Sequence, residues 1–119
     1  MNHLLFIELG LGADLHGQDV TRAAVRAAQD AIHRNSLPGL RAMLPSGDPA
    51  DMRVRVRLGV PVDPQSVDAD AVRAVFPFGT VEVECVPGGL LTSSGVAVPE
   101  LGDRSDQAIV VVAAVEVGY

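Results

Sequence analysis

The sequence contains no lysine, and all nine of its basic residues are arginines. Schiff-base catalysis and a Ser–Lys dyad both need a lysine amine, so the chain by itself can perform neither. Fifteen acidic residues outnumber the arginines and give a formal net charge of −6. Because polyanion binding depends on basic side chains that neutralise phosphates, we expect that nucleic acid is not a partner.

Cysteine and long apolar runs are scarce too. Cys85 is the only cysteine, so no disulfide can form within the chain. The longest apolar run, residues 108–115, is far shorter than the roughly eighteen residues of a membrane-spanning helix. The N-terminal residues lack the charged segment and apolar core of a secretory signal. These absences predict a soluble, cytoplasmic protein without a membrane partner.

The apolar residues that are present follow the periods of strands and helices. In chain order the pattern gives strand 4–9, helix 20–34, strand 52–60, helix 68–75, strand 80–86 and strand 107–117. This β-α-β-α-β-β order predicts one α/β (α+β) domain over residues 1–119. We expect a four-stranded mixed sheet with two helices mainly on one face.

Chain geometry predicts the directions of these strands. Strand–helix–strand units place their strands parallel through a right-handed crossover, and a strand that follows without a helix most simply runs back. The ends of the first three strands and the entry to the last one should therefore share one edge of the sheet. Strands 4–9 and 107–117 are apolar on both sides, whereas 52–60 and 80–86 carry charge on one side. We therefore expect the first and last strands at the centre of the sheet.

The stretch GLGADLHGQD, residues 10–19, is predicted to be the loop that follows the first strand. Asp14 and His16 stand two residues apart, which suits an acid/base with its orienting carboxylate or a pair of divalent-metal ligands. Alternatively, both side chains bond neighbouring backbone groups and only shape a turn. A dinucleotide-binding fingerprint is excluded because its third glycine would fall at Leu15.

Further polar residues are predicted at the same edge, where ligands of open α/β sheets usually bind. Glycines there let the backbone approach a ligand closely or adopt positive φ. The residues that we expect to bind a ligand are Gly10, Gly12, Gly17, Gln18, Asp19, Asp103, Ser105 and Asp106. Asp19 also suits the N-cap of helix 20–34. Ser93 and Ser94 are candidates for a nucleophile, although a Thr-Ser-Ser-Gly stretch is more typical of a turn.

Residues 10–17 carry the spacing GxGxDxHG with all five defined positions filled. In this motif, and in stretches from LFIELG near the start to the final VGY, the chain resembles the Lin0512 family of small conserved hypothetical proteins. The resemblance implies that Asp14 and His16 matter to the family, but it implies no established activity. The architecture is also similar to one α/β unit of the ring-opening amidohydrolases that act on cyanuric acid and barbiturate. Their Ser–Lys dyads cannot be carried over, because this chain has no lysine.

Two classes of function stay open. In the first, a small polar molecule binds at the sheet edge, with His16 and Asp14 as catalytic residues of a hydrolysis or a related proton transfer. In the second, the chain is a non-catalytic ligand-binding or assembly module whose loop is structural. The sequence contains no motif that indicates a particular cofactor. A divalent metal held by Asp14 and His16 is the one cofactor that we consider.

A homo-oligomer is expected in either case. Helices on one side of the sheet cannot cover both apolar faces of strand 107–117, so another copy should cover the second face. The likeness to the three-unit amidohydrolases implies a trimer. With strands 52–60 and 80–86 at opposite edges, the arginines at 53, 55 and 57 should meet Glu82 and Glu84 across subunits.

Overall fold

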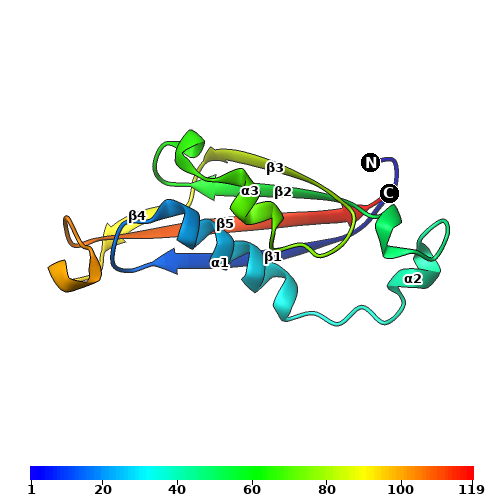
Figure 1. The fold of residues 1–119 in the computed structure, drawn as a ribbon, viewed down its shortest axis with the longest axis horizontal. Helices are drawn as coiled ribbons and strands as arrows, with labels where there is room; N and C mark the ends of the chain where they lie inside the picture. The colour runs from blue at the N-terminus through cyan, green and yellow to red at the C-terminus, as the bar shows by residue number, and fades with distance from the viewer.

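The computed structural model describes residues 1–119 as one domain built on a five-stranded mixed sheet (Figure 1). The strands are β1 (Leu4–Asp14), β2 (Arg53–Val60), β3 (Thr80–Pro87), β4 (Leu90–Ser93) and β5 (Gln107–Gly118). The helices are α1 (Val20–His33), α2 (Leu40–Met43) and α3 (Ala69–Arg73), with single 3₁₀ turns at Pro49–Asp51, Pro64–Ser66 and Pro99–Leu101. The predicted fold class is confirmed, and β4 is a short fifth strand in a segment predicted as loop.

The predicted strand directions are confirmed, whereas the predicted strand order is partly wrong. β2 and β3 are parallel, and β5 runs antiparallel to both β1 and β2. The order across the sheet is β1-β5-β2-β3, and β4 also pairs with β5. Thus β5 is central as expected, but β1 forms an edge and β2 lies inside the sheet. The charged side of β2 does not force it to an edge, because Arg55 and Arg57 lie on the helix-free face and pair with Glu116 and Glu84.

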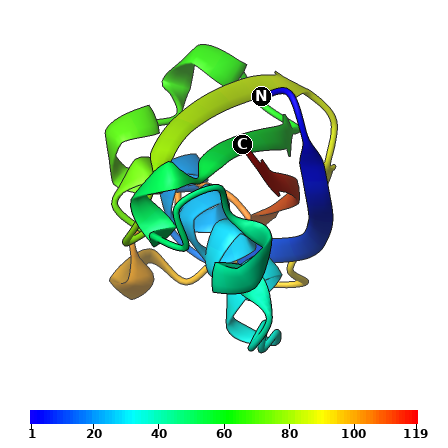
Figure 2. The same ribbon diagram turned by 90° about the vertical axis from the view of Figure 1, so that its right-hand side faces the viewer.

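Helix α1 begins and packs as the sequence predicts. Asp19 is its N-cap and accepts a hydrogen bond from the Arg22 backbone N–H. The buried face consists of small residues, namely Val20, Ala23, Ala24, Ala27, Ala28 and Ala31. This face lies over β1 and β5, and Figure 2 shows the sheet curling around the helix. None of the helices combines the length and apolarity that a membrane span requires.

Two glycines of β1 explain how closely α1 approaches the sheet. A Cβ atom at Gly10 would come within 2.5 Å of the Ala27 carbonyl oxygen, and one at Gly12 within 2.7 Å of the Arg26 carbonyl carbon. Real Cβ atoms do not approach backbone this closely, so only glycine fits below the helix at either position. β1 therefore runs on through the first half of the predicted loop and ends at Asp14.

The other face of the sheet carries no helix. Residues paired across strands share a face, and on this side Leu9 pairs with Ala114, and Leu11 with Val112. Farther across the sheet, Arg57 Nε lies 3.0 Å from Glu84 Oε2, and Arg55 Nη1 lies 3.3 Å from Glu116 Oε2. The expectation that these arginines need another subunit to meet a glutamate is therefore wrong, because β2 lies between β5 and β3.

Candidate functional site

The turn that joins β1 to α1 is closed by the carboxylate of Asp14. Its Oδ2 accepts a hydrogen bond of 2.8 Å from the Asp19 backbone N–H, while Gly17 and Gln18 adopt φ of 100° and 51°. Positive φ costs glycine little but is uncommon for glutamine, so other contacts must hold Gln18 in this conformation. The turn thus presents residues 15–18 at the end of the sheet.

Asp14 is buried, and its charge is balanced from α1. Its residue is 2 % exposed, and its Oδ1 lies 3.5 Å from Arg26 Nη1 and 3.9 Å from Arg22 Nη1. Arg26 also donates a 2.7 Å hydrogen bond to the Ala13 carbonyl. A buried carboxylate needs such partners, because an unpaired charge inside a protein is costly. Both oxygens of Asp14 are therefore engaged by the chain itself.

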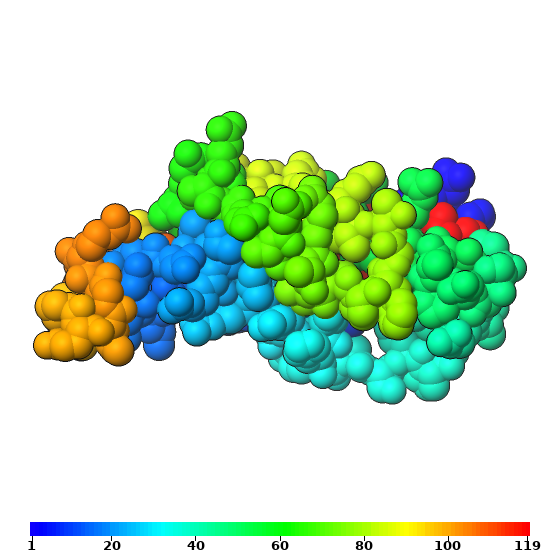
Figure 3. Space-filling model, in the orientation of Figure 1, coloured from blue at the N-terminus to red at the C-terminus, as the bar shows by residue number.

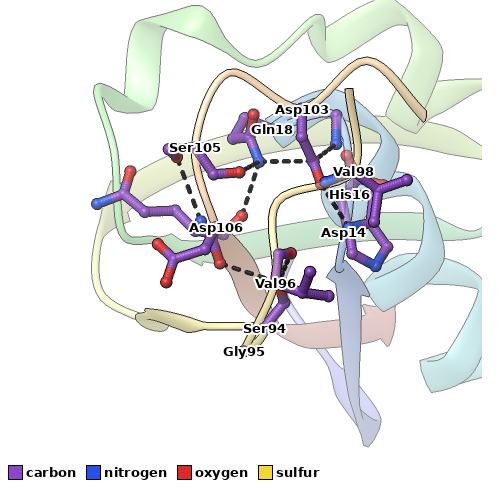
Figure 4. A network of polar contacts seen from close by, with 12 residues as sticks. Asp14, His16, Gln18, Ser94, Gly95, Val96, Val98, Asp103, Ser105 and Asp106 are labelled. Carbon is purple, nitrogen blue, oxygen red and sulfur yellow. Dashed lines mark hydrogen bonds and ion pairs between the residues drawn. The ribbon is translucent and has the colours of Figure 1, made fainter. Parts of the chain in front are cut away.

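Asp103 connects this turn to the distant segment that enters β5 (Figure 4). Its fully buried carboxylate accepts hydrogen bonds from His16 Nδ1 at 2.6 Å and from the backbone N–H groups of Gly17 and Val98 at 2.6 and 2.8 Å. Gln18 Nε2 adds a fourth at 3.0 Å. The Val98 N–H, followed by Gly17, His16 and Gln18, holds the pKa of Asp103 far below its usual range, against the opposing effect of burial.

His16 is fixed at one nitrogen and free at the other. Since an ionised Asp103 can only accept hydrogen bonds, Nδ1 must carry the proton in the 2.6 Å bond. No group of the chain bonds Nε2, which points away from Asp103 in Figure 4, and the side chain is 27 % exposed. A neutral His16 therefore presents an unprotonated Nε2 at the surface, where it can accept a proton.

Gln18 ties the same turn to residues 104–107. Its Nε2 donates to the Gln107 and Ser105 carbonyls at 2.8 and 3.4 Å, and its Oε1 accepts from the Arg104 N–H at 2.9 Å. Ser105 Oγ in turn accepts from the Gln107 N–H at 3.2 Å. These bonds supply the contacts that offset the positive φ of Gln18.

A groove adjoins this cluster beside the first turn of α1. Its volume is 440 Å³, and its polar lining includes Gln18, Arg104 and Ser105. Apolar walls come from Val20, Val62, Leu91 and Ile109. The guanidinium of Arg104 makes no hydrogen bond or ion pair within the chain. Figure 3 shows the segment around residues 95–105, coloured orange, projecting past the blue region where α1 begins.

The comparisons with known proteins agree with this architecture. The model of the Lin0512 family of conserved hypothetical proteins matches residues 4–117. The chain belongs to the Lin0512 family. It is also similar to an FtsZ-like protein of unknown function from Nostoc punctiforme, with 40% identity and a TM-score of 0.87, over 97% of this chain and 93% of that one. No curated protein matches the chain.

The other predicted site residues of this Lin0512 protein lie apart from the His16–Asp103 pair. Gly10 and Gly12 lie below α1, and Asp19 caps that helix. Asp106 contacts the end of β4, because its Oδ2 accepts a 2.7 Å hydrogen bond from Ser93 Oγ. The hydroxyls of both candidate nucleophiles therefore make hydrogen bonds within the chain. Ser93 Oγ donates to Asp106, and Ser94 Oγ donates to the Val96 and Asp106 carbonyls.

Three contributors to the cluster were not singled out from the sequence of the Lin0512 chain. They are Arg22 and Arg26, which face Asp14, and the backbone N–H of Val98, which binds Asp103. The sequence did hold a signal for the two arginines. Their i, i+4 spacing in the first turns of α1 places both on one side of the helix, next to the end of β1. No sequence pattern marks a backbone donor.

The metal interpretation of Asp14 and His16 finds no third ligand. Nowhere in the Lin0512 chain do three or more His, Cys, Asp or Glu side chains gather in a way that could hold a metal ion. Asp14 faces the arginines of α1, whereas His16 turns to Asp103. What the arrangement offers chemically is therefore an oriented, partly exposed imidazole. The groove is lined by Gln18, which shares Asp103 with His16, and not by His16 itself.

Proposed function

We propose that this protein binds a small polar molecule beside His16 and that Nε2 of His16 exchanges a proton with it, in a hydrolysis or a related proton-transfer reaction. The observation that carries the proposal is the 2.6 Å bond from His16 Nδ1 to the fully buried Asp103, with Nε2 free and the imidazole partly exposed. A histidine needs this combination of a held ring and an accessible nitrogen to act as a general base.

Asp103 would act as a positioning residue in this reaction. It holds the imidazole in the tautomer with the proton on Nδ1, so that the lone pair of Nε2 faces outward. Its negative charge also offsets the positive charge that the ring gains when Nε2 takes a proton. Three further donors keep Asp103 ionised and in place, namely the N–H groups of Val98 and Gly17 and the amide of Gln18.

The groove next to Gln18 supports a small molecule as the ligand. Its volume of 440 Å³ lies within the range of about 300–1,000 Å³ that is typical of small-molecule sites. Arg104 supplies an unpaired guanidinium, which suits a carboxylate or a phosphate, and the apolar walls suit a short hydrocarbon body. The ligand proposed is thus a small anion with one proton-exchanging group.

The test is a titration of ¹⁵N-labelled protein with small carboxylates, phosphates and amides, followed by NMR. Binding should shift the amide signals of residues 15–18 and 103–107 in the wild type, and His16→Gln should abolish turnover or proton exchange of the ligand while the fold is kept. His33→Gln is the matched control, because His33 is exposed at the far end of α1. Equal activity in the two variants would refute the role of His16.

The alternative is a non-catalytic ligand-binding or assembly module, and one observation favours it. The carboxylate of Asp103 and the amide of Gln18 are both fully used in bonds within the chain, as expected of groups that only hold two loops together. In that case His16 is a structural donor, and His16→Ala should destabilise the protein by about 1–3 kcal/mol. A functional His16 predicts the same loss of stability, because the bond to the buried Asp103 is removed in both cases, but it also predicts lost ligand binding. Unchanged ligand binding in a folded His16→Gln variant would therefore favour the module.

A further inference from the structure

We infer that the helix-free face of the sheet is an interface between copies of this chain. The apolar part of this face consists of Ile7, Leu9, Leu11, Val110, Val112, Ala114 and Leu90, and it is called the open face below. Ile7, Leu9, Leu11, Leu90 and Val112 are 45–68% exposed, although they project from regular strands. Contiguous apolar patches of this kind on a soluble protein mark sites of interaction.

The single chain is more extended and exposes more surface than an average compact domain of its length. Its radius of gyration is 15.7 Å, whereas about 13.5 Å is typical of a compact domain of 119 residues. Its accessible surface is 6607 Å², against about 6,100 Å² expected for a monomer of 12.4 kDa. The shape is elongated, with extents of 51, 25 and 18 Å, because the sheet is long and segments project at both of its ends (Figure 1). A second layer on the open face would bury part of this excess surface.

Beside Leu11, a partner can cover the open face but cannot extend the sheet, because α1 occupies the outer edge of β1 there. The outward backbone N–H of Leu11 donates to Asp30 Oδ2 at 2.9 Å, and the outward carbonyl of Ala13 accepts from Arg26 at 2.7 Å. These two groups are the ones that a further strand would need beside Leu11. The surface of β1 that a partner can contact there is therefore formed by the exposed side chains of Leu9 and Leu11.

Charge selects a second copy as the occupant. Beside the apolar strip, the same side of the sheet carries Arg53, Arg55, Arg57, Glu82, Glu84 and Glu116, so its formal charge is zero. The whole chain carries −6, and the remaining surface therefore holds all of the excess negative charge. The electrostatic repulsion between two copies is therefore weakest when this neutral side of each faces the other. Arg57 and Glu84 are each about half exposed and can exchange partners with their counterparts in another copy.

The area of the helix-free side limits how much surface two copies can bury. The face is four strands wide and about eight residues long, which gives about 500 Å² per copy from the usual strand spacing of about 4.8 Å and rise of about 3.3 Å per residue. Because the sheet curls around α1, two copies of this side bury at most about 1,000 Å² together, the size at which specific interfaces begin. Leu9, Leu11 and Val112 also line a shallow hollow of 380 Å³ that can receive the partner's side chains.

Sedimentation velocity tests the inference on the full chain. At micromolar concentration the wild type should sediment as a multiple of 12.4 kDa, whereas Leu11→Asp should sediment as a single chain with an unchanged far-ultraviolet spectrum. The matched control is Leu101→Asp, because Leu101 is 58% exposed, Leu11 is 59% exposed, and residue 101 lies outside the open face. This control should keep the wild-type mass.

Two results would overturn the inference. One is a wild type that stays a single chain at high micromolar concentration. The other is a folded Leu11→Asp variant that keeps the oligomeric mass. If Leu11→Asp fails to fold, Leu9→Asp replaces it, since Leu9 is 68% exposed on the same face and tolerates a polar side chain in the single chain.

Discussion

Gly12→Ala should destabilise this protein far more than a single added methyl group usually does. The new Cβ would lie within 2.7 Å of the Arg26 carbonyl carbon, where contacting carbon atoms prefer about 3.5–4.0 Å. α1 must therefore retreat from β1 by about 1 Å. The neighbours are helix backbone, so no side chain can rotate away to relieve the contact. Gly12 has no positive φ, and alanine meets no backbone strain there.

The cost of this change follows from what α1 buries. Ala23, Ala24, Ala27, Ala28 and Ala31 are at most 1% exposed and touch the sheet through single methyl groups. A gap of about 1 Å forfeits about half of the dispersion energy of each such contact. Overpacking of this kind typically costs 1–3 kcal/mol, and the rigid surroundings place Gly12→Ala at about 3 kcal/mol. This is a large part of the roughly 5–15 kcal/mol that holds a typical domain folded.

Urea unfolding followed by circular dichroism at one protein concentration measures this effect. Gly39→Ala is the matched control, because a Cβ at Gly39 meets no atom within 4 Å and its φ is −86°. Both variants reduce the entropy of the unfolded chain equally, which alone stabilises by about 0.4–1 kcal/mol. Gly39 is also the N-cap of α2, where alanine is slightly less favourable than glycine, so the excess loss in Gly12→Ala is a lower bound on the steric cost. Free energies of unfolding within about 0.5 kcal/mol of each other would refute this account of the two glycines.

Two further predictions concern titratable groups. The pKa of Asp103 is lowered in the folded state, chiefly by the Val98 N–H, so its contribution to stability is complete above the ordinary aspartate pKa and is lost as the pH falls through the folded value. Acid unfolding should therefore be less steep in Asp103→Asn than in the wild type, and parallel acid limbs would contradict this. Burial, with a smaller effect of Glu84, raises the pKa of the Cys85 thiol. Its reaction with a disulfide reagent near neutral pH should accelerate at least about tenfold in urea, and equal rates would contradict the prediction.

The sequence determined the local elements and much of the geometry at the end of the sheet. Alternation in residues 52–60 identified β2, helical spacing from residue 20 identified α1, and Asp19 marked where that helix begins. The crossover rule placed the ends of three strands beside the entry to β5. His16 and Asp103 are 87 residues apart, yet this rule predicted them at one edge, and their side chains are in direct contact. These inferences succeeded because each depends on a local pattern or on chain connectivity.

Tertiary structure alone decided the order of the strands and the individual contacts. A strand that is apolar on both faces can be central or can lie at an edge and keep one face open, and β1 does the latter because α1 covers only its inner face. The glycines of the motif likewise permit the close approach of either a ligand or a helix. At Gly10 and Gly12 the structure shows that it is the helix α1 that approaches. The four donors on Asp103 come from two segments that meet only in the folded chain. Period and spacing describe one segment at a time, whereas strand pairing and buried polar networks depend on which distant segments become neighbours.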